Sequence, residues 1–450
     1  MPFQKDVALN YGSVVKLRGL FNVRSIRNLR DESYLKCLQR PIVFISDPAA
    51  LHTMLIKEEH IFEESRSFIL GNMLIFGPGL LATLGDQHRK QRKILNPVFS
   101  VAHMRDMLPL FYNLRDAISL QVTKGQSEID MLQWTGRVAL ELIGQSGLGY
   151  SFDSFVSDMK DDYGAALKAL LLMDIDILQR LLPYVPFTVP AGIGRLAINL
   201  IPNAAVQKVK SIVDTMSTRS TRIFVSKKKA LADGDKAVLE QVGKGKDIMS
   251  VLMKANSLAS EDDRLSEKEL ISQMSTLVLA ATDTTSNTVA RILHLLSEHP
   301  DIQDKLRQEI LAAGAHEKCS YDELNKLPLL NAVCRETLRL YPAVTTLMRV
   351  PNKDTVLPLH EPIMGIDGTI IKEIPISRGT EVLIGAWACN LKKSLWGEDS
   401  TEWKPERWLN GLPTAVLEAP IPGVYSHLMT FLGGKRACIG FKFSEMEMSE

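Results

Sequence analysis

Residues 431–440, FLGGKRACIG, place one cysteine in a glycine-bearing loop at the start of the last predicted helix. A cysteine that binds a metal does so as a thiolate, and the N–H groups at a helix N-terminus favour that anion. Gly434 allows a tight turn beside a flat ligand, Gly440 allows the helix to pass close to it, and Arg436 can pair with a ligand carboxylate. The alternative is an inert, buried cysteine in a turn, the commonest fate of a lone cysteine. We favour Cys438 as a metal ligand.

The composition is that of an ordinary globular protein and argues against several classes. The 450 residues are 45% hydrophobic and 23% charged, and 53 Lys and Arg nearly balance 52 Asp and Glu. A nucleic-acid-binding protein usually has a strong basic excess, so nucleic acid is not an expected partner. Five cysteines at irregular spacings are too few for a disulfide scaffold, which indicates a reducing compartment. They are Cys37, Cys319, Cys334, Cys389 and Cys438.

Strands are predicted near both ends of the chain and helices between them. Short β-branched runs at 14–20 and 41–47 are typical of a small sheet, while the charged connection 22–39 is long for a hairpin. Helical periodicity dominates from about 49 to 341, and short strands with turns return in 356–384. The pattern predicts a mainly α fold with small β-sheets, an α+β mixture.

Two capping boxes mark helix starts in the second half of the chain. Ser266 with Glu269 begins a helix that can continue without Gly or Pro until Pro300. At 1.5 Å per residue that helix is about 50 Å long, enough to cross a whole domain. Ser320 with Glu323 begins the second.

We expect one large domain, 1–450, because no segment is typical of a linker. Its β-rich parts are about 11–48 and 343–386, and the remainder is helical. No stretch reaches the roughly 18 apolar residues of a membrane span, and the N-terminus lacks the apolar core of a secretory signal. Residues 181–202 are apolar but interrupted by Pro and Gly, so they are either a surface that contacts a bilayer or a buried loop.

The cysteine loop resembles the haem-binding loop of the cytochrome P-450 superfamily, Phe-x-x-Gly-x-Arg-x-Cys-x-Gly, at every fixed position. The resemblance implies the cytochrome P-450 fold and haem b as cofactor. It also implies that Cys438 is the axial ligand of the iron, that Arg436 binds a haem propionate and that Phe431 shields the sulfur. A cysteinate ligand favours O–O cleavage at the iron.

Further motifs of the family follow in the expected order. Glu336 and Arg339 match its Glu-x-x-Arg, in which side chains three residues apart share a helix face. Arg407, in the segment 405–408, resembles the second arginine of this structural triad. Glu336 would then be buried between both arginines and would hold the loop beneath the haem, where loss of one partner is costly.

Residues 280–287, AATDTTSN, resemble the oxygen-activation motif of the family. Small side chains at Ala280 and Ala281 would leave room above the haem, although the family usually has Gly at the second position. The Thr284 hydroxyl can bond the carbonyl four residues back and loosen the helix. Asp283 and Thr284 would then relay protons during oxygen activation. The alternative is an ordinary helix seam.

Other haem contacts are expected from two segments. His88 and Arg92 lie one helical turn apart and can face one propionate, although the family more often has Trp at the first position. Arg349 matches a further propionate-binding arginine. Basic residues flank these segments and would form either a docking face for an acidic electron donor or a merely solvated surface. They are Arg89, Lys90, Lys93 and Lys435.

The resemblance is to fungal microsomal members of the superfamily. Those members begin with a membrane anchor and a proline-rich hinge and continue past the cysteine helix into a terminal strand pair. We therefore interpret the sequence as a C-terminally truncated P-450 domain without its anchor, and expect weak or no turnover from the chain as written. The expected location is the cytosolic face of the endoplasmic reticulum membrane, with peripheral membrane contact.

The leading functional hypothesis is a monooxygenase that inserts one oxygen atom into a lipophilic small molecule, a secondary metabolite such as a terpenoid or a xenobiotic. Electrons would come from NADPH through NADPH–cytochrome P-450 reductase, with cytochrome b5 as an alternative donor. The predicted substrate pocket comprises Leu277, Ala280, Val344, Thr345, Thr346 and Leu347, together with Ala281 beside the haem. The alternatives are a haem-thiolate isomerase or dehydratase, and a non-catalytic or truncated haem-binding protein.

Overall fold

The computed structural model describes residues 2–18, 41–122, 130–152, 162–171, 198–314, 319–365 and 367–449. The connection 22–39 and most of the apolar segment 181–202 lie outside the described residues. Within them, no helix combines the length and the apolar character that crossing a membrane requires.

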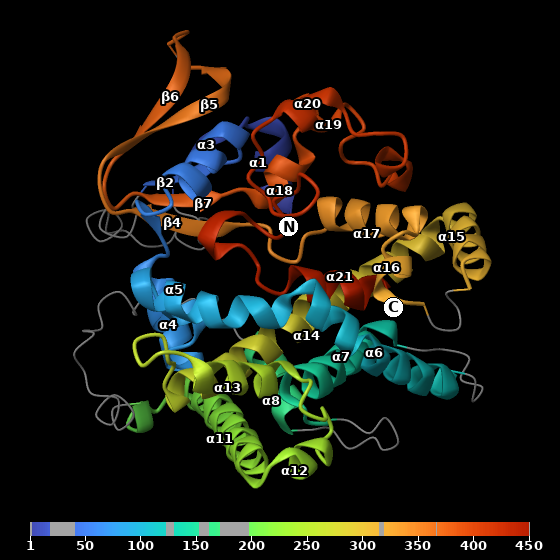
Figure 1. The fold of residues 1–450 in the computed structure, drawn as a ribbon. Coiled ribbons are helices and arrows are strands. Elements are labelled where there is room, and N and C mark those ends of the chain that lie inside the picture. The colour runs from blue at the N-terminus through green and yellow to red at the C-terminus, as the bar shows by residue number, and fades with distance from the viewer. Residues whose placement is uncertain are drawn as a thin grey trace.

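A five-stranded mixed sheet forms one side of the molecule (Figure 1). Its order is β1-β2-β7-β4-β3, in which β2 and β7 are parallel and the other pairs are antiparallel. The bounds are β1 Val14–Arg18, β2 Pro41–Ile45, β3 Phe62–Glu63, β4 Leu347–Pro351 and β7 Glu381–Ile384. Strands from both ends of the chain therefore meet in one sheet. Within the described residues, the strands predicted in 14–20 and 41–47 are present as the antiparallel pair β1 and β2.

A separate hairpin projects from this side of the molecule (Figure 1). It consists of β5 (Thr355–Met364) and β6 (Ile370–Ile376), which pair antiparallel with a register shift between Pro358 and Ile363. The buried Asp47 carboxylate fixes it to the sheet side. Asp47 caps α3 (Pro48–His52) and also accepts the backbone N–H of His360 at 2.8 Å.

Helices make up the rest of the described chain. On the sheet side they are α1 Pro2–Asn10, α3, α18 Ala386–Leu391, α19 Lys393–Trp396 and α20 Thr414–Glu418. The helical body contains α4 Arg66–Phe76, α5 Gly85–Leu95, α6 Val101–Val122, α7 Met131–Leu142, α8 Asp162–Leu171, α11 Ala204–Asp233, α12 Asp235–Leu239 and α13 Ile248–Leu258. It is completed by α14 Glu267–Glu298, α15 Pro300–Ala312, α16 Tyr321–Leu324, α17 Pro328–Leu340 and α21 Phe441–Ser449. The predicted mainly α fold with small sheets is confirmed.

The long helix α14 passes through the middle of the helical body (Figure 1). Its predicted capping box is present, since Ser266 accepts from the N–H of Glu269 and the Glu269 carboxylate accepts from the N–H of Ser266. The second predicted box, Ser320 with Glu323, caps α16. α14 packs against α7, α11, α17 and α21, so its side chains contribute to the largest hydrophobic cluster from several directions. The cysteine loop lies just before α21. Its turn Gly434–Arg436 packs against Thr53–Lys57, and α21 packs against α6, α14 and α17.

Candidate active site

The loop before α21 is held in a tight conformation by its own backbone and by close approach of other segments. The N–H of Cys438 donates to the Phe431 carbonyl at 2.9 Å. Gly434 has a φ of 72°, and a Cβ at this position would lie 1.9 Å from the Leu55 carbonyl oxygen. Gly433 meets the Pro422 carbonyl oxygen in the same way, at 1.9 Å. These glycines are therefore required by chain segments that pack onto the loop as well as by the turn.

Cys438 is an exposed residue with a free thiol. Desolvation by the surrounding protein raises the pKa of the Cys438 thiol. The N–H of Gly440 and the positive charge of Arg92 act in the opposite direction. Helix α21 starts three residues after Cys438, so the N–H groups of its first turn come soon after the cysteine in the chain. Phe431 packs edge-on against Tyr425, with ring centroids 5.4 Å apart, and lies 6.1 Å from the ring of Phe441.

Two of the three predicted haem-contacting arginines connect the cysteine loop to its surroundings. Arg92 on α5 donates to the Ala437 carbonyl at 2.9 Å. Arg436 donates to the carbonyls of Leu80 and Thr83, at 3.3 and 2.6 Å. Burial lowers the pKa of Arg436 to about 10, and the positive charges of Arg349 and Arg92 add smaller effects in the same direction.

Arg349 on β4 is the third of these arginines and the most buried. Its Nη1 is 2.6 Å from Glu64 Oε2, whereas its Nη2 is buried without a hydrogen-bond partner among the described residues. Burial raises the pKa of Glu64 against the opposite effects of Arg349 and Arg436. Glu64 was not predicted from the sequence, and no motif marks it.

The cluster fits a ligand that carries two carboxylates. Arg92, Arg349 and Arg436 bring three positive charges, of which Glu64 balances one, so two remain. Two haem propionates supply two negative charges, and the unpartnered Arg349 Nη2 offers a donor. His88 is buried, and its pKa is lowered to about 3 by burial and by Arg436 and Arg92, so its imidazole is neutral. A neutral imidazole can still donate one hydrogen bond to a carboxylate.

The flanking basic residues form a weaker positive surface than their sequence suggests. Three of them have acidic partners: Arg89 with Asp86 at 2.8 Å, Lys93 with Asp263 at 2.6 Å and Lys435 with Glu59 at 2.5 Å. Exposed pairs of this kind are partly neutralised and are screened by salt. Docking of an acidic electron donor on this face stays a prediction.

The motif on α14 has the predicted hydrogen bond. The Thr284 hydroxyl donates to the Ala280 carbonyl at 2.7 Å, so its oxygen retains its capacity to accept. The helix remains a regular α-helix through this position, which means that the bond does not interrupt it. Thr285 and Ser444 lie 3.1 Å apart and join the centre of α14 to α21, the helix that follows the cysteine. Asp283, which precedes Thr284, is half-buried.

The predicted pocket residues come from two places. Leu277 is buried on α14, Ala280 is exposed, and Ala281 packs against the hydrophobic cluster that Phe431 also joins. The other four residues follow α17, and the last of them begins β4, the strand that carries Arg349. They are Val344, Thr345, Thr346 and Leu347. Their assembly with Leu277 into one pocket stays a prediction.

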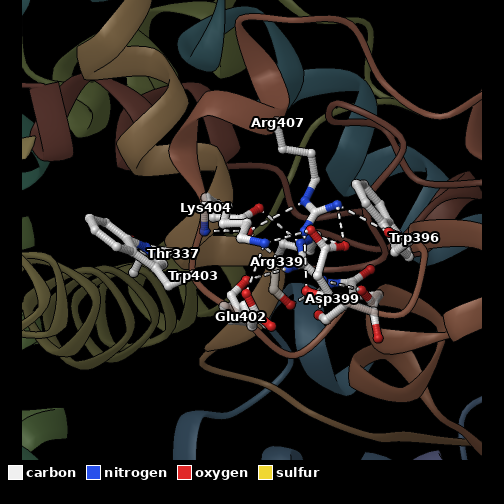
Figure 2. A network of polar contacts seen from close by, with 12 residues as sticks. Thr337, Arg339, Trp396, Asp399, Glu402, Trp403, Lys404 and Arg407 are labelled. Atoms are coloured by element: carbon white, nitrogen blue, oxygen red, sulfur yellow. Dashed lines mark hydrogen bonds and ion pairs between the residues drawn. The ribbon is translucent and has the colours of Figure 1, made fainter.

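Glu336 is fully buried and accepts hydrogen bonds within the polar network that Figure 2 shows around Arg339 and Lys404. Its carboxylate accepts two hydrogen bonds of 2.9 Å from Arg339, and one of 3.0 Å each from the Lys404 N–H and Trp408 Nε1. Arg407 Nε is 3.6 Å from the same carboxylate. The hydrogen bonds of Arg407 go elsewhere.

Figure 2 shows Arg407 directed towards Asp399 and Trp396. Arg407 Nη1 donates to the Trp396 carbonyl at 3.0 Å and to Asp399 Oδ1 at 3.2 Å. Lys404 and Arg407 hold the pKa of Asp399 below its usual range. Glu336 therefore lies beside both arginines, as predicted, but it is hydrogen-bonded only to Arg339. Asp399, which was not predicted from the sequence, is the carboxylate that accepts from Arg407.

Comparison with known proteins agrees with this geometry. The sequence matches the family Cytochrome P450 over residues 31–449. Cytochrome P450 monooxygenases 219 and 81 of Postia placenta are 59% and 58% identical to it, over 99% of this chain and 80% of each relative. A ganoderic acid synthetase of Ganoderma lucidum is 44% identical over the same shares of the two chains. Because the family is matched along almost the whole chain, the chain belongs to the cytochrome P450 family and is a monooxygenase whose family cofactor is a haem with a thiolate ligand.

Proposed function

We propose that the protein inserts one atom of dioxygen into a lipophilic small molecule, with Cys438 as the thiolate ligand of haem b. The observation that carries this proposal is the position of Cys438, in a loop bonded to α5 through Arg92 and followed at once by α21. When bound, the haem iron supplies the activation of dioxygen. The chain's own residues hold the cofactor, exclude water and deliver protons.

Arg92, Arg349 and Arg436 are proposed to hold the propionates, with His88 as a neutral donor. Phe431 shields one side of the thiol, supported by its packing against Tyr425. Gly434 and Gly440 keep the loop free of side chains, and Gly440 has only Phe99 near its Cβ position, at 3.8 Å. Glu336, Arg339 and Arg407 have a structural role.

Asp283 and Thr284 are proposed to hold and move protons at the centre of α14. The Thr284 hydroxyl donates its proton to the Ala280 carbonyl, so the hydroxyl oxygen can accept a hydrogen bond from water. Asp283 precedes it on the half-buried part of the helix and can exchange protons with solvent. Leu277, Ala280, Ala281 and segment 344–347 would line the substrate side.

The substrate is proposed to be a terpenoid-like secondary metabolite or a xenobiotic, supported by the name of the Ganoderma lucidum relative. Electrons would come from NADPH through a cytochrome P-450 reductase, with cytochrome b5 as an alternative donor. The proposed location is the cytosolic face of the endoplasmic reticulum membrane, which is typical of fungal relatives.

The test is the absorption spectrum of the reduced protein with carbon monoxide, which distinguishes thiolate from imidazole ligation. We expect the thiolate band in the wild type and in Cys319→Ser, whose cysteine lies far along the chain before α16. We expect Cys438→Ser to lose it. A thiolate band that persists in Cys438→Ser would overturn the assignment. In a screen of lipid extracts, substrate-dependent NADPH consumption is expected for the wild type and not for Cys438→Ser.

A further inference from the structure

Glu64 is a buried carboxylate beside the arginine cluster and is not among the residues proposed to hold the haem. It follows β3, which pairs antiparallel with β4 so that Phe62 faces Pro351 and Glu63 faces Val350. Continued by one residue, this register places Glu64 beside Arg349. The sheet therefore fixes the relative position of the two side chains, and their terminal atoms lie 2.6 Å apart.

The Glu64–Arg349 pair is buried, and it uses only one of the two terminal nitrogens of the arginine. The side chains of Arg349 and Glu64 are only 2% and 7% exposed, so solvent screens their interaction poorly. Arg349 Nη1 donates to Glu64 and to the Met348 carbonyl, which saturates that nitrogen. Nη2 is left without a partner among the described residues. A planar guanidinium fixed at one nitrogen presents the other in a defined direction.

The charge of Glu64 also sets the balance of the cluster. Without it, Arg92, Arg349 and Arg436 would carry three positive charges, one more than the two propionates neutralise. With it, the charges of these three arginines, of Glu64 and of a bound dicarboxylate sum to zero. Burial of uncompensated charge is costly, so the carboxylate makes the cluster specific for two anionic groups.

We propose that Glu64 is a positioning residue for the haem propionates, which aims Arg349 Nη2 and matches the charge of the arginine cluster to a dianion. This proposal rests on the proposed haem site. It assigns two separable contributions to one side chain, its negative charge and its reach.

The experiment separates charge from reach in the haem-loaded protein. Glu64→Gln keeps the length and an acceptor oxygen but removes the charge, so the ferric–ferrous midpoint potential should shift to more positive values, because added positive charge favours the added electron. Glu64→Asp keeps the charge but is one methylene shorter, so transfer of haem to apomyoglobin should become roughly tenfold faster as Arg349 loses its fixed orientation. The matched control is Asp86→Asn, which removes the same charge from a side chain that is 92% exposed on α5, and should change neither measurement.

The proposal is overturned if the midpoint potential of Glu64→Gln equals that of wild type or of Asp86→Asn, or if Glu64→Asp loses haem at the wild-type rate. Should one variant fail to fold, the other still decides, since each measurement tests a required contribution. The carbon monoxide spectrum of the wild type distinguishes failure of the haem site from failure of the role of Glu64. A missing thiolate band refutes the haem site itself, whereas a normal band with unresponsive variants refutes only the role of Glu64.

Discussion

Replacing Glu336 by Gln tests whether the buried network of Figure 2 stabilises the fold through charge. The carboxylate is fully buried and accepts four hydrogen bonds, two of them from Arg339. An amide has one acceptor oxygen, so its NH₂ group would face N–H donors and would leave the Arg339 charge buried without a carboxylate.

Loss of one partner from a buried ion pair typically costs about 3–5 kcal/mol of unfolding free energy. Three carbonyls, those of Asn390, Ser400 and Glu402, still accept from Arg339 and place the expected loss near the lower end of that range. The matched control is Glu402→Gln. Its side chain is 59% exposed and pairs with Lys404 at 2.8 Å, so its loss should cost less than about 1 kcal/mol.

The assay is urea unfolding of the haem-loaded protein, followed by tryptophan fluorescence and by the haem absorption band. Trp403 and Trp408 belong to the network, and their fluorescence reports directly on its opening. An unfolding free energy for Glu336→Gln within about 1 kcal/mol of that for Glu402→Gln would refute the reasoning. It would mean that the carboxylate acts only through its shape.

Three further predictions concern the active site. Thr284→Ala should uncouple NADPH use from product formation and release hydrogen peroxide. The control Thr288→Ala, one turn along the same helix, should leave the ratio of product formed to NADPH consumed unchanged. Equal ratios in both variants would remove Thr284 from proton delivery. Gly434→Ala should lower haem retention and the unfolding temperature by more than Gly411→Ala. Both glycines have positive φ, but only Gly434 meets the backbone of another segment. Equal losses of unfolding temperature in calorimetry would contradict this. His88 has a folded-state pKa of about 3, below its unfolded value, so the unfolded state binds the additional proton and stability of the haem-free protein should fall as pH decreases from about 6.5 towards 3. His88→Gln should flatten this acid limb in urea titrations, and an unchanged pH slope would show that the imidazole is not held neutral by its surroundings.

Local patterns predicted much of the helical frame. The capping box at Ser266 and the absence of Gly and Pro after it predicted α14, because both effects act within one or two turns. The back-bond of Thr284 follows from the four-residue spacing of a helix in the same way. The motif around Cys438 predicted a glycine turn, and Gly434 has the required positive φ.

Contacts between distant segments could not be predicted in this way. The approach of the Leu55 carbonyl to Gly434 joins residues almost four hundred positions apart. Arg407 lies within ion-pair distance of Glu336, as expected, but its hydrogen bonds go to Asp399 and Trp396, since the loop geometry decides which acceptors its donors reach. The acidic partners of the basic surface likewise come from other segments, as Asp263 does for Lys93.

The sequence by itself determined the chemistry that is available: one thiol in a glycine turn ahead of a helix, an acid–threonine pair on a long helix and a set of arginines. These features are local, because they depend on residue type and on spacing within a few turns of backbone. Only the tertiary structure decided the electrostatic balance of the arginine cluster. Glu64 meets Arg349 because β3 and β4 pair in one register, and no local propensity encodes a strand register between segments nearly three hundred residues apart.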